Sequence, residues 1–224
     1  MTHLESELSK VRQSALEMMN IVKTQLQKCK EAFLTSNNEL SLDVMHNEKR
    51  VNGYELLIDN DCENIIACFN PVAIDLRLVL ATLKINYHLE RIGDNAEGIA
   101  RNVLDLQAKW NPELIKSLEL VEAFEMADEM FGYIIDSYEH EDTTMARKVF
   151  EKDLFIDNIT NKAIHIISDY LKTNHSNIEK DLYLLLIHRK LERTGDLIKN
   201  MAEEIIFYVE AKVLKHKAEP DPLA

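Results

Sequence analysis

Two pairs of acidic residues at helical spacing are the first candidates for chemistry in this sequence. Glu90 and Asp94 stand four positions apart, and Glu192 and Asp196 repeat that spacing in the second half of the chain. Side chains at this spacing share one face of a helix, where two carboxylates repel each other mildly. A bound cation would relieve the repulsion, and so would a salt bridge with a nearby arginine. Both interpretations are open at this point.

Each acidic pair belongs to a longer motif that occurs twice. The segment 89–94 reads LERIGD, and the segment 191–196 reads LERTGD. A glycine inside a helix costs about 1 kcal/mol relative to alanine. Gly93 and Gly195 therefore indicate either a close approach of two helices or room for a ligand beside the carboxylates. The repeated motif predicts that the chain is a tandem duplication.

Apolar residues recur at steps of three and four along most of the chain, which is typical of amphipathic helices. The 224 residues include only 5 Gly and 4 Pro, far fewer turn residues than a β-rich protein needs. We expect Asn70 to cap a helix that begins at Pro71, and Asn111 and Pro112 to start another helix in the same way. The pattern predicts six long helices, over about 4–33, 42–66, 71–106, 112–140, 142–171 and 184–208.

These helices predict an all-α fold, a tandem repeat of two three-helix bundles with six long antiparallel helices. Each half places its copy of the motif in the middle of its third helix. We therefore expect a first repeat over residues 1–109, a second repeat over residues 110–216 and a frayed C-terminal tail over residues 217–224.

Antiparallel packing within each half brings further oxygen-bearing side chains level with the two acidic pairs. Counting back from the turns places Glu48 and Asn52 opposite the first pair, and Asp153 and Asp157 opposite the second. Because Asn52 lacks a carboxylate, we expect the second half to bind a cation more tightly. The candidate ligands are Glu48, Asn52, Glu90, Asp94, Asp153, Asp157, Glu192 and Asp196, and weaker candidates are Glu55, Asp59, Glu97, Asn161 and His165.

This ligand set consists almost entirely of oxygen atoms and is open to water. Such sets suit Mg, Mn, Ca or Fe better than zinc, which prefers Cys and His. His165 would favour a transition metal if it joins the second site, although a lone histidine on a helix more often has a structural role. The identity of the metal stays open.

Composition excludes several classes of function. A formal net charge of −13 argues against nucleic acid as a partner, since phosphate contacts need clustered Lys and Arg. The 3 Cys form no C-x-x-C motif and are typical of a reducing compartment. The N-terminus resembles no signal peptide, and no apolar run approaches the ~18 residues of a membrane span. We expect a soluble, cytoplasmic protein.

The duplicated motif resembles that of the PhoU family of phosphate-signalling proteins. The segment 70–77, NPVAIDLR, is similar to the family's Pro-x-Ala-x-Asp-Leu-Arg entry to its third helix. The likeness extends over nearly the whole chain, in the family's two-repeat order. It implies a tandem three-helix-bundle protein that binds metal through Glu/Asp-x-x-x-Asp motifs, with iron, zinc, manganese and magnesium all found among members. The pair Glu48 and Asn52 departs from that motif, which puts the first-half site in doubt.

The resemblance also implies a function and partners. Family members regulate the phosphate response negatively, through the phosphate-sensing histidine kinase and the ATPase of the phosphate ABC importer. On this basis we expect those two proteins as partners, contact with the membrane only through them, and a homodimer.

Two other classes of protein compete with this interpretation. A di-iron carboxylate enzyme needs Glu-x-x-His pairs, and the sequence offers only a solitary Asp43-x-x-His46. No nucleophile stands beside a base, and no glycine-rich loop could cradle phosphate. We therefore expect a regulator without enzymatic activity. The alternative is a helical scaffold whose acidic face docks a basic partner protein without metal.

Overall fold

The fold is entirely helical in the part of the chain that the structure describes. This computed structural model covers residues 2–106, 109–175 and 177–214, so the tail expected over 217–224 lies outside it. No strand occurs in those residues. The helices are α1 (His3–Thr35), α2 (Asn38–Phe69), α3 (Ala73–Leu106), α4 (Pro112–Ser117), α5 (Leu120–His140), α6 (Thr143–Thr173) and α7 (Ile178–Glu210).

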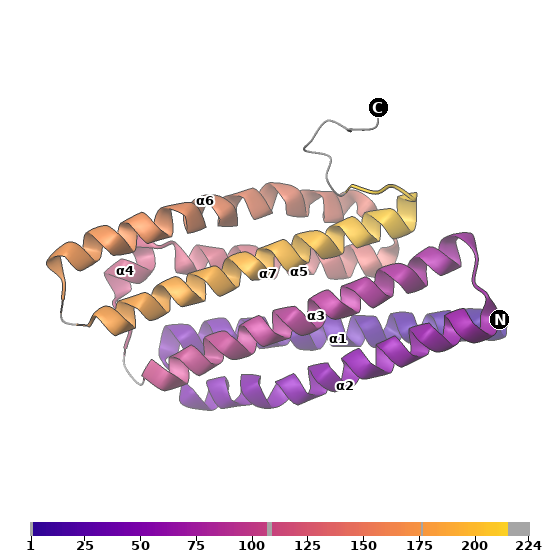
Figure 1. Ribbon diagram of the computed structural model, residues 1–224, viewed down its shortest axis with the longest axis horizontal. Coiled ribbons are helices and arrows are strands. Elements are labelled where there is room, and N and C mark those ends of the chain that lie inside the picture. Colours follow the sequence, from indigo (N-terminus) through magenta and orange to yellow (C-terminus); the bar gives the residue numbers. More distant parts are fainter. Residues whose placement is uncertain (1, 107–108, 176, 215–224) are drawn as a thin grey trace.

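The helices form two antiparallel bundles that lie side by side (Figure 1). The first bundle contains α1, α2 and α3, and the second contains α5, α6 and α7, with the short α4 against α5. The bundles meet where α3 packs on α7 and α1 packs on α5. This arrangement confirms the predicted tandem repeat of three-helix bundles.

The two copies of the motif meet where α3 crosses α7. The two helices run antiparallel, because Lys84 pairs with Glu204 at 2.9 Å while Asn95 donates to Thr194 at 3.4 Å. Asn95 directly follows the first motif, and Thr194 lies within the second. The duplicated residues therefore gather at the centre of the contact between the halves.

Side chains cap several helix starts, including the predicted cap Asn111, but the start of α3 differs from the prediction. The side chains of Asn37, Asn111 and Asp142 accept backbone hydrogen bonds at the starts of α2, α4 and α6. Asn70, in contrast, is the C-cap of α2 in a left-handed conformation with φ 47°, and α3 begins only at Ala73. Asparagine tolerates this conformation better than most residues, so the segment ends one helix before it begins the next.

The helix expected over 112–140 is present in two pieces. α4 ends at Ser117 and α5 begins at Leu120, because Glu119 adopts a left-handed conformation with φ 51°. The buried His188 of α7 stabilises the break by donating from Nε2 to the carbonyl oxygen of Leu118 at 3.1 Å. The prediction of one continuous helix over 112–140 was therefore wrong, because His188, the residue that stabilises the break, lies far away in the sequence.

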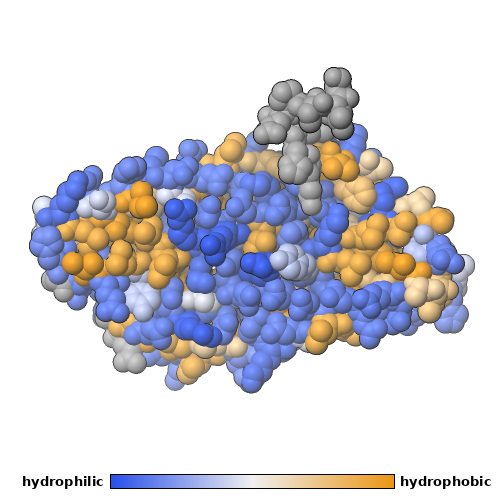
Figure 2. All heavy atoms as spheres, in the orientation of Figure 1, coloured by the Kyte–Doolittle hydropathy of each residue, from blue (hydrophilic) through white to orange (hydrophobic). Residues whose placement is uncertain are grey.

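One continuous hydrophobic core extends through both bundles, from Leu8 to Tyr208. The face formed by α3 and α7 is hydrophilic in its middle and hydrophobic toward both ends (Figure 2). Across the described ranges, no helix combines the length and the apolar character needed to cross a membrane.

Candidate metal centre

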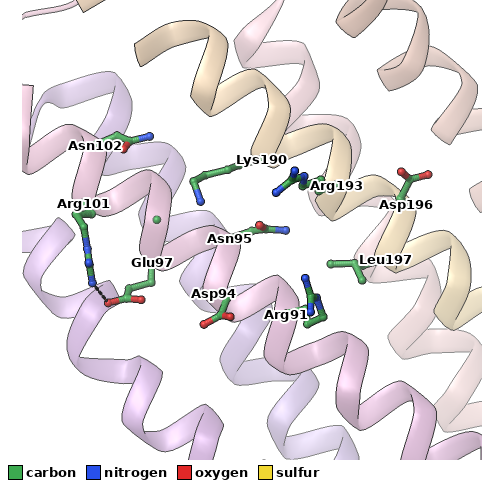
Figure 3. A pocket seen from close by; sticks show the side chains of 11 residues that line it. Arg91, Asp94, Asn95, Glu97, Arg101, Asn102, Lys190, Arg193, Asp196 and Leu197 are labelled. Atoms are coloured by element: carbon green, nitrogen blue, oxygen red, sulfur yellow. Dashed lines mark hydrogen bonds and ion pairs between the residues drawn. The ribbon is translucent and has the colours of Figure 1, made fainter. Parts of the chain in front are cut away.

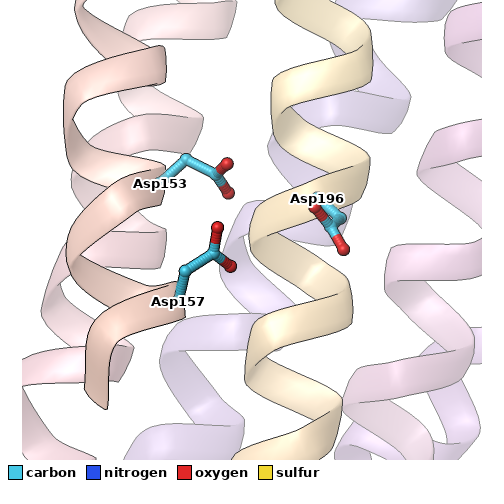
Figure 4. Close-up of side chains that lie close together, drawn as sticks. All are labelled: Asp153, Asp157 and Asp196. Atoms are coloured by element: carbon cyan, nitrogen blue, oxygen red, sulfur yellow. The ribbon is translucent and has the colours of Figure 1, made fainter. Parts of the chain in front are cut away.

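Three aspartates come together between α6 and α7 in the second half. Asp153, Asp157 and Asp196 each offer a carboxylate oxygen within 4.8 Å of the other two. Figure 4 shows Asp153 and Asp157 on one helix, facing the helix that carries Asp196. Asp153 is only 2% exposed, and burial raises the pKa of its carboxyl group. The register predicted from the turn is therefore the register that the helices adopt here.

A lysine that the sequence analysis missed lies against this triad. Lys199 donates from Nζ to Asp153 Oδ2 at 2.5 Å and to Asp196 Oδ1 at 2.8 Å. Burial alone would lower the pKa of Lys199, but the hydrogen bonds and charges of the two aspartates outweigh it and raise the pKa. Its position three residues after Asp196, on the same helical face, was the available signal. Arg193, the arginine of the second motif, forms no salt bridge within the described residues.

The remaining second-half candidates lie around the triad rather than in it. Glu192 is partly buried, and its pKa is raised by burial and by the charge of Asp196. Asn161 and His165 are exposed on α6 and are not part of the cluster of three aspartates. The structure thus brings together only part of the ligand set that the sequence predicted for the second half.

The first half buries a glutamate at the position that corresponds to Asp153. Glu48 of α2 is 7% exposed, and neither carboxylate oxygen has a hydrogen-bond partner within the usual geometric limits. Burial and the charge of Asp94 raise the pKa of Glu48 to about 7, although the side chain of Gln25 offsets part of the shift. The group therefore changes its charge near neutral pH.

Other acids of α2 and α3 surround Glu48. Burial and Asp94 raise the pKa of Glu90, and burial, Asp59 and Asp94 raise the pKa of Glu55. Glu55, a weaker candidate on the sequence, thus belongs to the electrostatic cluster of the first half. The predicted ligand Asn52 is instead exposed.

Two further weak candidates of the first half already have polar partners. Asp59 accepts a hydrogen bond from Asn86 at 2.8 Å, and Glu97 pairs with Arg101 at 2.7 Å. These contacts leave Glu48, Glu55, Glu90 and Asp94 as the acids of the first-half cluster.

The two mid-helix glycines make room for the buried acids. A Cβ atom at Gly93 would lie 2.9 Å from Glu48 Oε2, and one at Gly195 would lie 3.3 Å from Asp153 Oδ1. The neighbouring helix approaches closely at both places. Its nearest atom is the Glu48 carboxylate oxygen at Gly93, and at Gly195 it is Ile156 Cδ1, at 3.2 Å. Of the two alternatives raised by the sequence, this geometry supports the close approach of two helices.

The residues present fit a hard divalent or trivalent cation. All ligand atoms of the triad are carboxylate oxygens, which Mg, Mn, Ca and Fe accept readily. Asp153 Oδ1 and both oxygens of Glu48 are buried without a hydrogen-bond partner. Such atoms cost free energy that a bound cation would recover.

Comparison with known proteins places both halves in one family. The model of the PhoU domain matches residues 15–103 and again residues 120–205. The chain is 33% identical over 224 residues to "Phosphate-specific transport system accessory protein PhoU homolog" of Burkholderia sp, covering 100% of this chain and 95% of the relative. It is 30% identical over 211 residues to "Phosphate-specific transport system accessory protein PhoU" of Escherichia coli (strain K12), covering 94% and 87%.

Solved structures agree with this result. PhoU from Pseudomonas aeruginosa superposes with a TM-score of 0.89 at 28% identity, covering 94% of this chain and 100% of that chain. The regulatory protein PhoU from Streptococcus pneumoniae shares the fold, with a TM-score of 0.86 at 23% identity, covering 95% and 100%. The domain matches, the relatives and the shared fold lead to one conclusion: this chain belongs to the PhoU family.

Proposed function

We propose that this protein regulates phosphate uptake and phosphate-starvation signalling without enzymatic activity. The observation that carries the proposal is full-length similarity to proteins named as accessory proteins of the phosphate-specific transport system. An accessory protein acts through other proteins. The partners we propose are the ATPase of the phosphate importer and the phosphate-sensing histidine kinase, which this protein would meet in the cytoplasm as a homodimer.

Deletion of the gene tests the regulatory role. The deletion strain should express its phosphate-starvation genes in phosphate-rich medium, and the intact gene supplied in trans should switch them off again. Co-purification from the native cell at high and low phosphate would identify the importer ATPase or the kinase as partner. Normal repression of the phosphate-starvation genes in the deletion strain, with no second copy of the gene present, would refute the proposed regulatory role.

We further propose that the acidic clusters bind metal ions. The proposed ligands are Asp153, Asp157, Glu192 and Asp196 in the second half, with Glu48, Asn52, Glu90 and Asp94 in the first. The aspartate triad and the partnerless oxygens of Glu48 support this proposal. Fe, Mn, Mg and Zn are the candidate ions, with the hard ions favoured by the oxygen ligands.

Calorimetric titration of metal-stripped protein, prepared without a histidine tag, tests metal binding with each of these ions. The double variant Asp157→Asn and Asp196→Asn should lose the second-half site while its helicity by circular dichroism stays unchanged. Asp136→Asn is the matched control, because Asp136 is a half-exposed aspartate of the same half, outside the triad. Equal binding by the double variant and the wild type would rule out the second-half site.

One observation favours a second candidate function, a metal-free scaffold. Lys199 already neutralises part of the triad through two hydrogen bonds. In this alternative the acidic face docks a basic partner protein. Absence of metal binding by the wild type, together with normal repression of the starvation genes, would select the scaffold.

A further inference from the structure

A groove of about 760 Å³ lies between α3 and α7 on the face where the two motifs meet. Figure 3 shows its lining side chains, which come from both helices and therefore from both repeats. Arg91 and Arg193, the arginines of the two motifs, both line it, as do Lys190 and Arg101. The antiparallel crossing of α3 and α7 thus brings cationic residues of both halves to one place.

Three of these cations form no salt bridge with a carboxylate in the part of the chain that the structure describes: Arg91, Lys190 and Arg193. Arg91 donates to the hydroxyl of Tyr87 at 3.0 Å and lies 5.6 Å from the centre of that ring. Figure 3 shows Lys190 and Arg193 extending from α7 into the space beside α3.

Most acids of the groove already have a cation of their own. Glu97 pairs with Arg101 at 2.7 Å, and Asp196 pairs with Lys199 at 2.8 Å. Asp94 is the one carboxylate of the lining without a salt bridge among the described residues. The groove therefore carries an excess of positive charge on a chain whose formal net charge is −13.

The lining also contains an unsatisfied hydrogen-bond donor. The amide nitrogen of Asn102 is buried and has no acceptor among the described residues. A buried donor without a partner costs about 1–3 kcal/mol, so such donors are usually occupied by a ligand or water. Ammonium, guanidinium and amide donors at one place indicate a ligand made of acceptor oxygens.

Gly98 is what allows Lys190 to lie in the groove. A Cβ atom at Gly98 would come 2.2 Å from Lys190 Nζ and 2.7 Å from its Cε. The lysine side chain therefore lies over Gly98 of α3, where a larger residue would collide with it.

We propose that this groove binds a small phosphorylated anion. Guanidinium groups pair with phosphate oxygens through two parallel hydrogen bonds, and lysine adds a point charge. The volume falls within the roughly 300–1,000 Å³ of small-molecule sites and exceeds what a single phosphate group fills. The ligand class therefore includes phosphate esters as well as inorganic phosphate. The cations of this groove, Arg91, Lys190 and Arg193, are not among the proposed metal ligands, although Asp94 and Asp196 line the groove as well.

Calorimetric titration of metal-stripped protein with inorganic phosphate, pyrophosphate and adenosine monophosphate tests the proposal. We expect saturable binding with a Kd at or below about 1 mM for at least one probe. A response to inorganic phosphate identifies the free ion as sufficient. A response only to the nucleotide or to pyrophosphate identifies a larger phosphorylated ligand.

Charge-neutral variants locate the site. Lys190→Met and Arg193→Met should each weaken binding of the responding probe at least tenfold. Arg189→Met is the matched control, because Arg189 is an exposed cation of the same helix that does not line the groove, and its Kd should stay within twofold of the wild type. Circular dichroism checks that each variant is folded. Absence of saturable binding by the wild type, or equal weakening by Arg189→Met, overturns the proposal.

Discussion

At the scale of single residues, the two repeats differ most sharply at one pair of equivalent positions. Glu97 and Lys199 each follow the aspartate of their motif by three residues. Lys199 neutralises the second-half triad, whereas Glu97 adds another acid near the first-half cluster. The sequence ranked the second half as the better cation site because of Asn52. The contacts of Lys199 favour the opposite order in the wild-type protein, because a metal must displace this lysine.

Substitution Lys199→Met tests this order. Removing the internal cation should tighten metal binding in the second half at least tenfold, as measured by calorimetry. It should also lower the free energy of unfolding of the metal-free protein by about 2 kcal/mol, because the buried Asp153 loses its partner. Lys199 is partly exposed, so this loss of stability is smaller than the loss from breaking a fully buried ion pair. Lys162→Met, at an exposed position of α6, is the control. Unchanged metal affinity in Lys199→Met would contradict the competition.

Glu48 should make the metal-free protein less stable as pH rises. Its pKa is about 7 in the folded state, against an ordinary value of 4.5, so the folded state holds the proton more tightly. The stability that protonated Glu48 contributes is complete below pH 4.5 and is lost as pH rises through about 7. The loss amounts to at most about 3 kcal/mol.

Denaturant unfolding between these pH values measures the effect. Glu48→Gln mimics the protonated form and should flatten the decline seen in the wild type. Burial and nearby charges also raise the pKa of the neighbouring Glu55 and Glu90, so the difference between the two proteins isolates Glu48. Metal affinity should show the opposite trend and increase with pH, since the ion binds the carboxylate. Parallel pH profiles of the wild type and Glu48→Gln would refute the assignment.

At the scale of helices, periodicity predicted most of the fold, and tertiary contacts decided the rest. Apolar spacing predicted the long helices because this signal is local, and of the two predicted asparagine caps the structure has Asn111 but not Asn70. The break between α4 and α5 contains neither Pro nor Gly, and His188 stabilises it from another helix. No local pattern around Glu119 could have revealed it.

The candidate sites, too, could be predicted from the sequence only in part. Counting back from a turn placed Asp153 and Asp157 opposite Asp196, since antiparallel helices keep their register. In the first half the same counting placed Glu48 and Asn52 opposite the acidic pair, and in the structure Glu48 is buried whereas Asn52 is exposed. Rotation of a helix about its axis depends on packing, which spacing along the chain does not specify.

The mid-helix glycines allow a matched test of close packing. Gly53→Ala in α2 should raise stability by about 1 kcal/mol, because a Cβ atom there meets nothing within 4 Å. Gly93→Ala receives the same gain but brings Cβ to 2.9 Å from Glu48 Oε2 and 3.3 Å from Val51 Cγ1. Overpacking costs about 1–3 kcal/mol, so Gly93→Ala should be less stable than Gly53→Ala by that amount. Equal thermal midpoints of the two variants would show that Glu48 moves aside freely.

At the scale of the whole molecule, the two halves share one core and several polar contacts. Arg77 Nε donates to the carbonyl oxygen of Tyr208 at 3.0 Å, and Arg12 pairs with Glu141. Trp110 lies near the junction of the repeats, 6% exposed, with its ring centre 5.1 Å from that of Phe33. Such contacts couple the stability of one half to that of the other.

We therefore expect the protein to unfold in a single cooperative transition. The fluorescence of Trp110, the only tryptophan of the chain, should change at the same denaturant concentration as the helical circular dichroism signal. Two separated transitions would indicate that each repeat is stable alone. The metal-stripped protein is the appropriate sample, since an ion bound in one half would stabilise that half selectively.

The antiparallel meeting of α3 and α7 gives one chain the layout of a two-fold dimer. In a dimer of identical subunits, each mutation appears twice, once on either side of the axis. Here the two sides are encoded separately and can evolve apart. An acid at position 97 and a base at position 199 can therefore coexist around the same axis. The two ends of this surface are therefore distinguishable, and a mutation can alter one of them at a time.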